Sequence, residues 1–228
     1  LEQMDRIHSS GSIPLLVGGT MFYFKTLQYG LPDLPSADET VREKLLDEAR
    51  EHGWQSLYQR LLEIDPDSAQ RINPNDKQRI QRALEIYEIS GVTPSAHAAS
   101  ATADEIPWQV MKIEIWPSER SLLHENIAKR LDVMFKNGFI EEVETLKAMG
   151  LANSLPAMRA VGYRQVLEYL DGSLGYDEMR KRCVYSTRQL AKRQLTWLRN
   201  DPEVTWFDSK NPAYAQKVLE FVKKKTTV

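Results

Sequence analysis

A breaker-free stretch near the carboxyl end limits the possible folds of this chain more than any other feature. From Met179 to Asn200 there is no glycine or proline, and strong helix formers dominate, so the stretch predicts one long helix. It contains no acidic residue. Its cations are Arg180, Lys181, Arg182, Arg188, Lys192, Arg193 and Arg199.

The cations of this helix are expected to form a row. At helical spacing one face carries Lys181, Arg188, Lys192 and Arg199, with Tyr185 and Leu195 between them. Like charges in a row repel one another unless an anion faces them, so this face predicts contact with a nucleic-acid backbone. A solvated basic surface is the alternative.

The net charge shows that this basic character is local. The 228 residues carry a formal charge of −2, which excludes a generally cationic coating protein. The single cysteine, Cys183, excludes an internal disulfide framework and indicates a reducing, cytoplasmic location. Neighbouring cations could lower the pKa of this thiol, or it could simply be a small packing residue.

The start of the chain has no targeting signal. No apolar run approaches the roughly 20 residues needed to span a bilayer, and no charged-then-apolar leader is present. The first residue is Leu1, within what resembles the middle or end of a helix. We therefore expect a fragment of a longer protein.

An apolar run followed by two glycines predicts a ligand-binding edge. Residues 13–17 are all apolar, which favours a strand buried on both faces of a parallel sheet. Gly18 and Gly19 would allow a ligand to approach the backbone at its carboxyl end. Thr20 then begins a helix over 21–29, either as an ordinary N-cap or beside a bound group.

The remaining patterns predict mostly helices. Two further strands are expected over 109–115 and 204–208, which makes a thin sheet and again suggests strands missing before Leu1. Further helices are expected over 39–52, 54–64, 76–90, 118–137, 140–149, 160–170, 177–200 and 214–225.

Two linkers divide the chain into domains. A proline-rich segment over 31–38 and an Ala/Ser/Thr-rich segment over 93–103, expected to be flexible, enclose three or four helices. We therefore expect an α/β core made of residues 1–32 and 106–228, with a helical domain of residues 33–105 inserted into it.

Polar clusters of the kind that bind phosphate and bases occur in four places. They are Arg42, the segment Asn75–Arg82, the segment Arg159–Arg164 and the segment Lys192–Arg199. Guanidinium pairs suit phosphates, glutamine suits an adenine edge, and Tyr163 at a helix start could stack on a base. Each cluster alone would more often be a solvated or salt-bridged surface.

Several familiar catalytic patterns are absent from the sequence. It contains no Walker A motif, no dinucleotide-binding glycine motif and no nucleophile elbow. The four histidines are scattered, and no Cys/His metal pattern occurs.

Five motifs together resemble the bacterial tRNA dimethylallyltransferase (tRNA isopentenyltransferase) family, in order and over essentially the whole chain. They are Leu15–Phe24, Leu34–Asp38, Asn73–Arg82, Arg159–Gln165 and Thr187–Arg199. The resemblance implies a P-loop NTPase-like, nucleotide-binding core with an inserted helical domain that clamps tRNA. It also implies transfer of a dimethylallyl group from dimethylallyl diphosphate to N6 of the adenosine just 3′ of the anticodon, assisted by Mg²⁺, in a monomer.

The resemblance also implies roles for individual residues. Thr20 matches the family's active-site threonine, and Arg130 resembles an arginine near the diphosphate. The positions that match tRNA contacts are Arg42, Gln78, Arg79, Ile80, Gln81, Arg82, Arg159, Ala160, Val161, Gly162, Tyr163, Arg164, Lys192, Arg193, Gln194, Leu195, Thr196, Trp197, Leu198 and Arg199.

One departure from the family leaves alternatives open. The family's P-loop, its metal-binding hydroxyl and its general-base aspartate lie before the segment that ends at Val17, and this sequence does not contain them. A noncatalytic tRNA-binding fragment is therefore an alternative to the transferase. A small-molecule P-loop kinase is a third possibility, although it would not need the basic helix.

Overall fold

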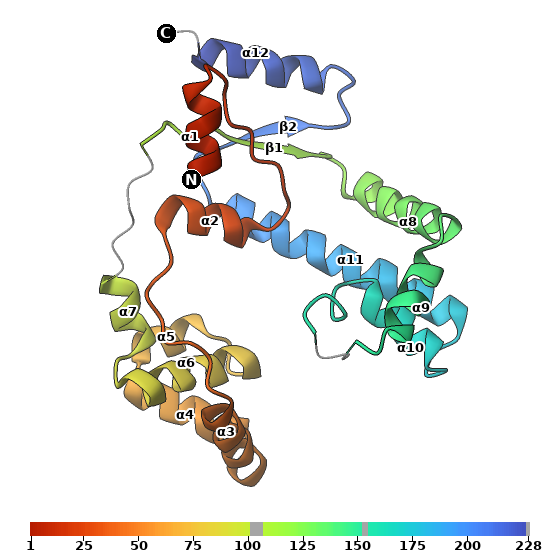
Figure 1. Ribbon diagram of the computed structural model, residues 1–228. Coiled ribbons are helices and arrows are strands. Elements are labelled where there is room, and N and C mark those ends of the chain that lie inside the picture. Colours follow the sequence, from red (N-terminus) through yellow and green to blue (C-terminus); the bar gives the residue numbers. More distant parts are fainter. Residues whose placement is uncertain (101–106, 152–154, 227–228) are drawn as a thin grey trace. The chain divides into compact units, whose positions relative to one another are not determined.

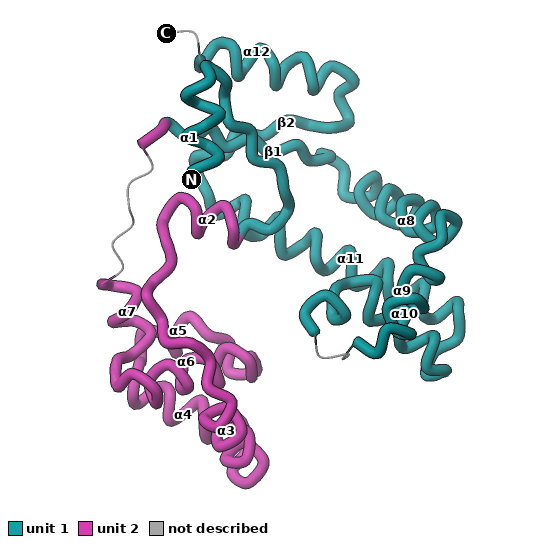
Figure 2. The backbone as a smooth tube through the Cα atoms, in the orientation of Figure 1, with its two compact units in different colours: residues 1–21, 109–228 teal, residues 22–108 magenta. Residues whose placement is uncertain are grey.

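The computed structural model describes residues 1–100, 107–151 and 155–226, which are mostly helical with one two-stranded sheet (Figure 1). The chain forms two compact units (Figure 2). Unit 1 contains Leu1–Met21 and Gln109–Val228, and unit 2 contains Phe22–Trp108. The domain division expected from the sequence, with changes after residues 32 and 105, stays a prediction.

Unit 2 is a group of short helices. Helix α2 (Met21–Tyr29) leads into it, and the others are α3 (Glu39–His52), α4 (Trp54–Ile64), α5 (Pro66–Arg71), α6 (Lys77–Ser90) and α7 (Pro94–Ser100). The predictions for α2, α3, α4 and α6 are confirmed to within one residue. Two short helices, α5 and α7, were not expected.

Helix α7 corrects the prediction of a flexible linker over 93–103, of which residues 101–103 lie outside the described part. The buried carboxylate of Asp65 explains its position. Asp65 accepts hydrogen bonds from the backbone N–H of Ser68 at 3.0 Å, which caps α5, and of Ser95 at 2.9 Å in α7. One side chain thus ties the two helices together.

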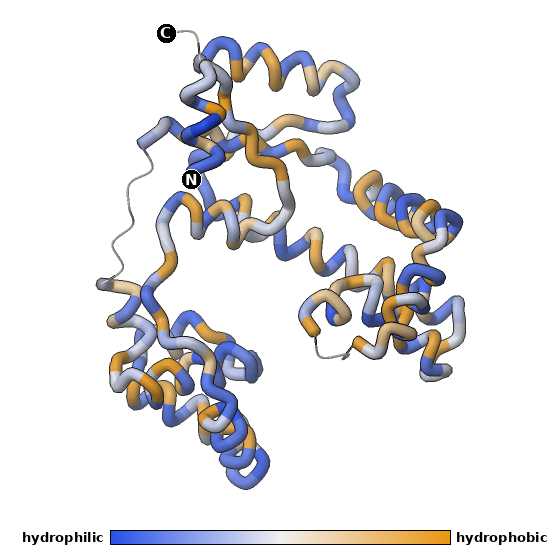
Figure 3. Tube along the Cα trace, in the orientation of Figure 1, coloured by the Kyte–Doolittle hydropathy of each residue, from blue (hydrophilic) through white to orange (hydrophobic). Residues whose placement is uncertain are grey.

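The core of unit 2 follows the helical period of its sequence. Apolar and polar bands alternate along α3, α4 and α6 in Figure 3. The apolar side chains meet at a buried cluster that includes Leu45, Leu57, Leu61, Ile80 and Leu84. Burying each of these side chains contributes about 1.5–3 kcal/mol of hydrophobic free energy.

Unit 1 contains the sheet. Strands β1 (Lys112–Trp116) and β2 (Val204–Asp208) pair in parallel, with Ile113 opposite Thr205 and Ile115 opposite Phe207. The connection between them contains α8 (Arg120–Lys136), α9 (Phe139–Ala148), α10 (Tyr163–Leu170) and α11 (Tyr176–Arg199), because parallel strands need a crossover. Helices α1 (Glu2–Ser9) and α12 (Tyr214–Thr226) complete the unit.

The predicted strand over residues 13–17 is wrong. This run between α1 and α2, coloured apolar in Figure 3, has no strand conformation. Its side chains are largely exposed, with Leu15 at 82% and Val17 at 87%. A segment becomes a strand only when a neighbour accepts its backbone hydrogen bonds. In the described chain β1 pairs with β2 alone.

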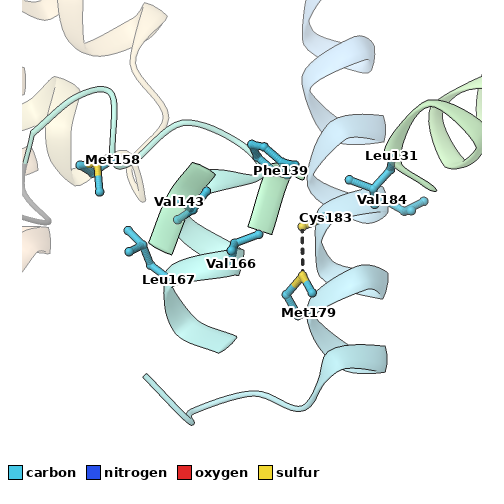
Figure 4. Close-up of a cluster of buried hydrophobic side chains, with 9 residues drawn as sticks. All are labelled: Leu131, Phe139, Val143, Met158, Val166, Leu167, Met179, Cys183 and Val184. Carbon is cyan, nitrogen blue, oxygen red and sulfur yellow. Dashed lines mark hydrogen bonds between the residues drawn. The ribbon is translucent and has the colours of Figure 1, made fainter. Parts of the chain in front are cut away.

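The main core of unit 1 lies between α8, α9, α10 and α11. Figure 4 shows nine of its side chains, among them Leu131, Val143, Val166 and Cys183. Cys183 is fully buried, and burial raises the pKa of its thiol to about 11, with a further contribution from Glu168. The packing interpretation of this cysteine is confirmed, and the idea that neighbouring cations lower its pKa is wrong.

No helix among the described residues is both long and apolar enough to cross a bilayer.

Candidate nucleic-acid interface

The long helix α11 carries two different kinds of cation. Near its start, Arg180 forms a bidentate ion pair with Asp132 of α8, with distances of 2.7 and 2.8 Å, and Arg182 donates to Glu178 at 2.9 Å. Towards its end, no acidic oxygen of the described residues lies within 4 Å of Arg188, Lys192, Arg193 or Arg199. Positive charge without an ion-pair partner among the described residues is therefore concentrated from the middle of the helix to its end.

The exposed side chains of α11 match the predicted face in part. Lys181, Lys192 and Arg199 are exposed, and so is Tyr185, whose side chain could stack on a base. Arg188 departs from the prediction because it is half-buried, and its Nε is a buried donor without a hydrogen-bond partner among the described atoms.

A group of cations around Arg188 was not identified from the sequence. On α8, Arg120 Nε lies 3.4 Å from His124 Nε2. Desolvation, Arg188 and Arg120 together lower the pKa of His124, because each of them disfavours the charged imidazole. These groups come from helices separated in sequence, and the sequence offers no signal of their meeting.

The tRNA-contact segment over 192–199 also contains side chains that face the protein. Leu198 is buried, and Leu195 and Gln194 are half-buried, whereas Thr196 and Trp197 are exposed. Within the described residues, the side chains available to a partner on this segment are therefore mainly the cations, Thr196 and Trp197.

The start of α10 is held against α11 through Gln165. Its Oε1 accepts the backbone N–H of Gly162 at 2.8 Å, and its Nε2 donates to Ser186 Oγ of α11 at 3.2 Å. Gly162 has a φ of 99° and a ψ of −59°, a conformation open only to glycine. This residue therefore shapes the predicted anion-binding segment through its backbone.

The side chains flanking Gly162 differ in exposure. Arg159, Ala160 and Arg164 are exposed, and Arg164 Nε lies 3.9 Å from Glu168. Val161 is half-buried.

Tyr163 is engaged inside unit 1. Its ring meets Phe139 edge-on at a centroid distance of 5.1 Å, and its hydroxyl donates to Glu142 at 2.5 Å. The hydrogen bond to Glu142, with burial, raises the pKa of Tyr163. Stacking of this ring on a base stays a prediction.

The bend at Gly18 and Gly19, just before α2, contacts the basic helix α11. Thr20 is exposed and immediately precedes α2, as expected. Gln194 Nε2 donates to the backbone oxygen of Gly19 at 2.5 Å, which joins the bend to the last turns of α11. A Cβ added at Gly19 would lie 2.7 Å from that nitrogen, so only glycine leaves this contact undisturbed.

We expect Gln194→Ala to lower turnover about two- to tenfold by loosening this bend, the range that corresponds to one hydrogen bond. Gly19→Ala should have a similar effect, because its methyl group displaces Gln194. Steady-state kinetics on the two single variants and the double variant test this. If the two losses multiply in the double variant, the two residues act separately and the contact has no role.

In unit 2 the predicted contacts form one network. Gln81 Nε2 donates to the backbone oxygen of Arg42 at 3.2 Å, and Arg42 Nε donates to Glu85 at 3.0 Å. The helical period, which turns Ile80 and Leu84 inward, predicts a mainly exposed Arg82. Arg82 is instead half-buried, because it donates to Glu85 at 2.9 Å and to the backbone oxygen of Pro35 at 2.7 Å. A buried glutamate on α6 is thus the residue that the sequence analysis missed here.

The other members of the segment 78–82 are placed as the helical period predicts. Gln78 and Arg79 are exposed, with Arg79 Nε at 3.2 Å from Asp76. Ile80 is fully buried, so a contact with a partner would have to come from its backbone.

Two predicted features remain: the role of Arg130 and the binding of Mg²⁺. Arg130 is exposed on α8, and its predicted role near the diphosphate stays a prediction. In the described part of the chain, no group of three or more His, Cys, Asp or Glu side chains could hold a metal ion. These side chains therefore do not fit a Mg²⁺ site.

Comparison with known proteins identifies the family. Residues 1–201 match the model of the IPP transferase family. Among similar proteins, a tRNA dimethylallyltransferase from Coxiella burnetii (strain CbuG_Q212) is 49% identical over 224 residues, which cover 98% of this chain and 74% of that protein. The chain belongs to the IPP transferase family, and its relatives are prenyltransferases.

Solved structures agree with this assignment. A tRNA isopentenylpyrophosphate transferase from Bacillus halodurans is 31% identical with a TM-score of 0.63, covering 98% of this chain and 70% of that one. A eukaryotic dimethylallyltransferase acting on tRNA is 25% identical with a TM-score of 0.69, covering 98% of this chain and 60% of that one.

Proposed function

We propose that this protein transfers a dimethylallyl group from dimethylallyl diphosphate to N6 of the adenosine 3′-adjacent to the anticodon of tRNA. The contact between Gln194 and Gly19 carries the proposal, because it joins the bend that presents Thr20 to the helix turns with uncompensated cations. Relatives named for this activity at 49% identity support it.

The chemistry of the reaction explains why such a site needs both a hydrogen-bonding group, such as Thr20, and nearby cations. An adenine amino group is a weak nucleophile, so a hydrogen-bonding group must hold it in line with the allylic carbon. The new C–N bond forms as the C–O bond to diphosphate breaks, and nearby cations stabilise the departing anion. The amino nitrogen gives up one proton to a base, a role that the family resemblance assigns to an aspartate outside this sequence. In our proposal Thr20 binds the amino group, and Arg130 lies near the diphosphate.

The tRNA is held by its phosphates and an unstacked loop base. An anticodon loop offers such a base at low cost, and exposed Lys192, Arg193 and Arg199 would bind the backbone. Arg159 and Arg164 form a second cationic patch in unit 1, and the inserted helices supply Arg42 and Arg79. With tRNA as its substrate, we expect the enzyme to act in the cytoplasm.

The parallel pair β1–β2 belongs, in our proposal, to a P-loop NTPase-like core. Parallel pairing across a long helical crossover supports this assignment. The alternative of a noncatalytic tRNA-binding protein is not favoured, because the relatives matched over 98% of the chain are transferases.

Lys192→Ala or Arg193→Ala should weaken tRNA binding and flatten its salt dependence. Each lost phosphate contact lowers the log–log slope by about 0.7–0.9. Fluorescence anisotropy with a labelled anticodon stem-loop, across a range of salt concentrations, measures both quantities. Arg182→Ala is the matched control, because its charge is already compensated by Glu178 on the same helix.

An unchanged slope in both variants would reject the phosphate contacts, and with them the proposed binding face. An equal change in the control would mean that overall charge, rather than a local contact, governs the binding.

A further inference from the structure

Glu85 is the most deeply buried charged residue in the described chain. It lies on α6 within unit 2, and its side chain is only 1% exposed. Its carboxylate accepts the backbone N–H of Asp38 at 2.9 Å, Arg42 Nε at 3.0 Å and Arg82 Nη1 at 2.9 Å. Burying a carboxylate is costly, and such complete pairing is what makes it tolerable.

The three donors keep Glu85 ionised. Burial opposes ionisation, but hydrogen bonds from Arg82 and Asp38 and the charge of Arg42 outweigh it and lower the pKa of Glu85. The residue is therefore a fixed negative point that orients two guanidinium groups.

The orientation leaves part of Arg42 available to a partner. A guanidinium has five N–H donors. Of the side-chain nitrogens of Arg42, only Nε donates a hydrogen bond to another described residue. Its Nη1 lies 3.9 Å from Glu39, beyond hydrogen-bonding distance, and the side chain remains 39% exposed. Arg82 instead uses two nitrogens internally, on Glu85 and on Pro35, which fixes the proline-rich segment against α6.

A second ion network on the same helix shows the contrast. Glu88 binds Arg60, which also donates to Glu48 at 2.9 Å, and Lys44 Nζ lies 3.9 Å from Glu88. At Glu85 one buried carboxylate faces two cations. Both terminal nitrogens of Arg60 donate to carboxylates within the unit, whereas the terminal nitrogens of Arg42 make no hydrogen bond among the described residues.

We propose that Glu85 is a positioning residue for tRNA binding: it holds Arg42 so that its unused nitrogens meet a backbone phosphate. The inference rests on the proposed function, because it takes Arg42 as an RNA contact. Fixing the side chain in advance removes the entropic cost of ordering it on binding.

The test is a double-mutant cycle on RNA affinity. Glu85→Gln should weaken binding of a labelled anticodon stem-loop about five- to tenfold in the otherwise unchanged protein, the range expected for a charge-assisted contact. In the Arg42→Ala background the same change should alter affinity less than about twofold, because the residue through which it acts is gone. Circular dichroism melts of every variant measure stability separately.

Glu88→Gln is the matched control, since it lies one turn further along α6 and also breaks an ion pair. It should lower the melting temperature without changing RNA affinity. If Glu85→Gln does not fold, the cycle is run with Glu85→Asp, which keeps the charge but withdraws it from Arg42.

Two outcomes separate the inference from the function beneath it. An equal loss of affinity from the Glu85 change in both backgrounds, or an equal loss from Glu88→Gln, overturns the positioning role. If Arg42→Ala alone leaves affinity intact, Arg42 is not an RNA contact, and that part of the proposed function fails.

Discussion

Thr20→Ala should lower the turnover number of the enzyme by about a hundredfold, the effect typical of removing one hydrogen-bonding group from a reacting centre. Thr20 is exposed at the start of α2, beside a bend held by Gln194, and it has no place in a hydrophobic core. Its loss should therefore leave folding and RNA affinity nearly unchanged. Single-turnover kinetics with saturating tRNA, alongside stem-loop binding, separate the two effects.

Thr20→Ser provides the matched control, because it keeps the hydroxyl and removes only a methyl group. We expect it to retain most of the activity. If Thr20→Ala weakens RNA binding as much as it slows turnover, the residue contributes to binding alone and its proposed role at the amino group is wrong.

Gly162→Ala should destabilise unit 1 by about 2–3 kcal/mol, because backbone strain and overpacking act together. The φ of 99° disfavours any side chain, and a Cβ there would lie 3.1 Å from Cζ of the buried Phe139. Urea denaturation followed by circular dichroism measures the change in unfolding free energy.

Two variants separate the strain from the collision. Gly172→Ala, at a φ of 76° with nothing within 4 Å, should cost only about 1 kcal/mol, which is the strain alone. In a Phe139→Leu background, Gly162→Ala should cost less than in the native protein, since the colliding ring is absent. An equal cost in both backgrounds would show that the ring is not the obstacle.

The helices were largely predictable because their signals are local. Asp38 and Asp76 cap α3 and α6 by accepting N–H groups three residues on, and Gly91 ends α6 with a φ of 68°. Such caps, with the apolar period between them, are properties of adjacent residues. The basic character of α11 was likewise visible from its sequence alone.

The run over residues 13–17 shows where local signals fail. Its apolar residues favour a strand, but a strand exists only through hydrogen bonds to a neighbour. The helical period also fails to predict the burial of Arg82, for a related reason. One of its partners, Glu85, is a neighbour on the same helix, but the other, Pro35, is 47 residues away in the sequence.

From the sequence alone follow most of the long helices, the local basic surface and, through the order of its motifs, the family. Only the tertiary structure decided which charges find partners elsewhere in the fold: Arg180 meets Asp132 of α8, Lys192 and Arg193 meet no carboxylate within the described chain, and Glu85 is buried between two arginines. The reason is physical. The state of a charge depends on burial and on partners brought from distant parts of the chain, whereas helix signals act between neighbours.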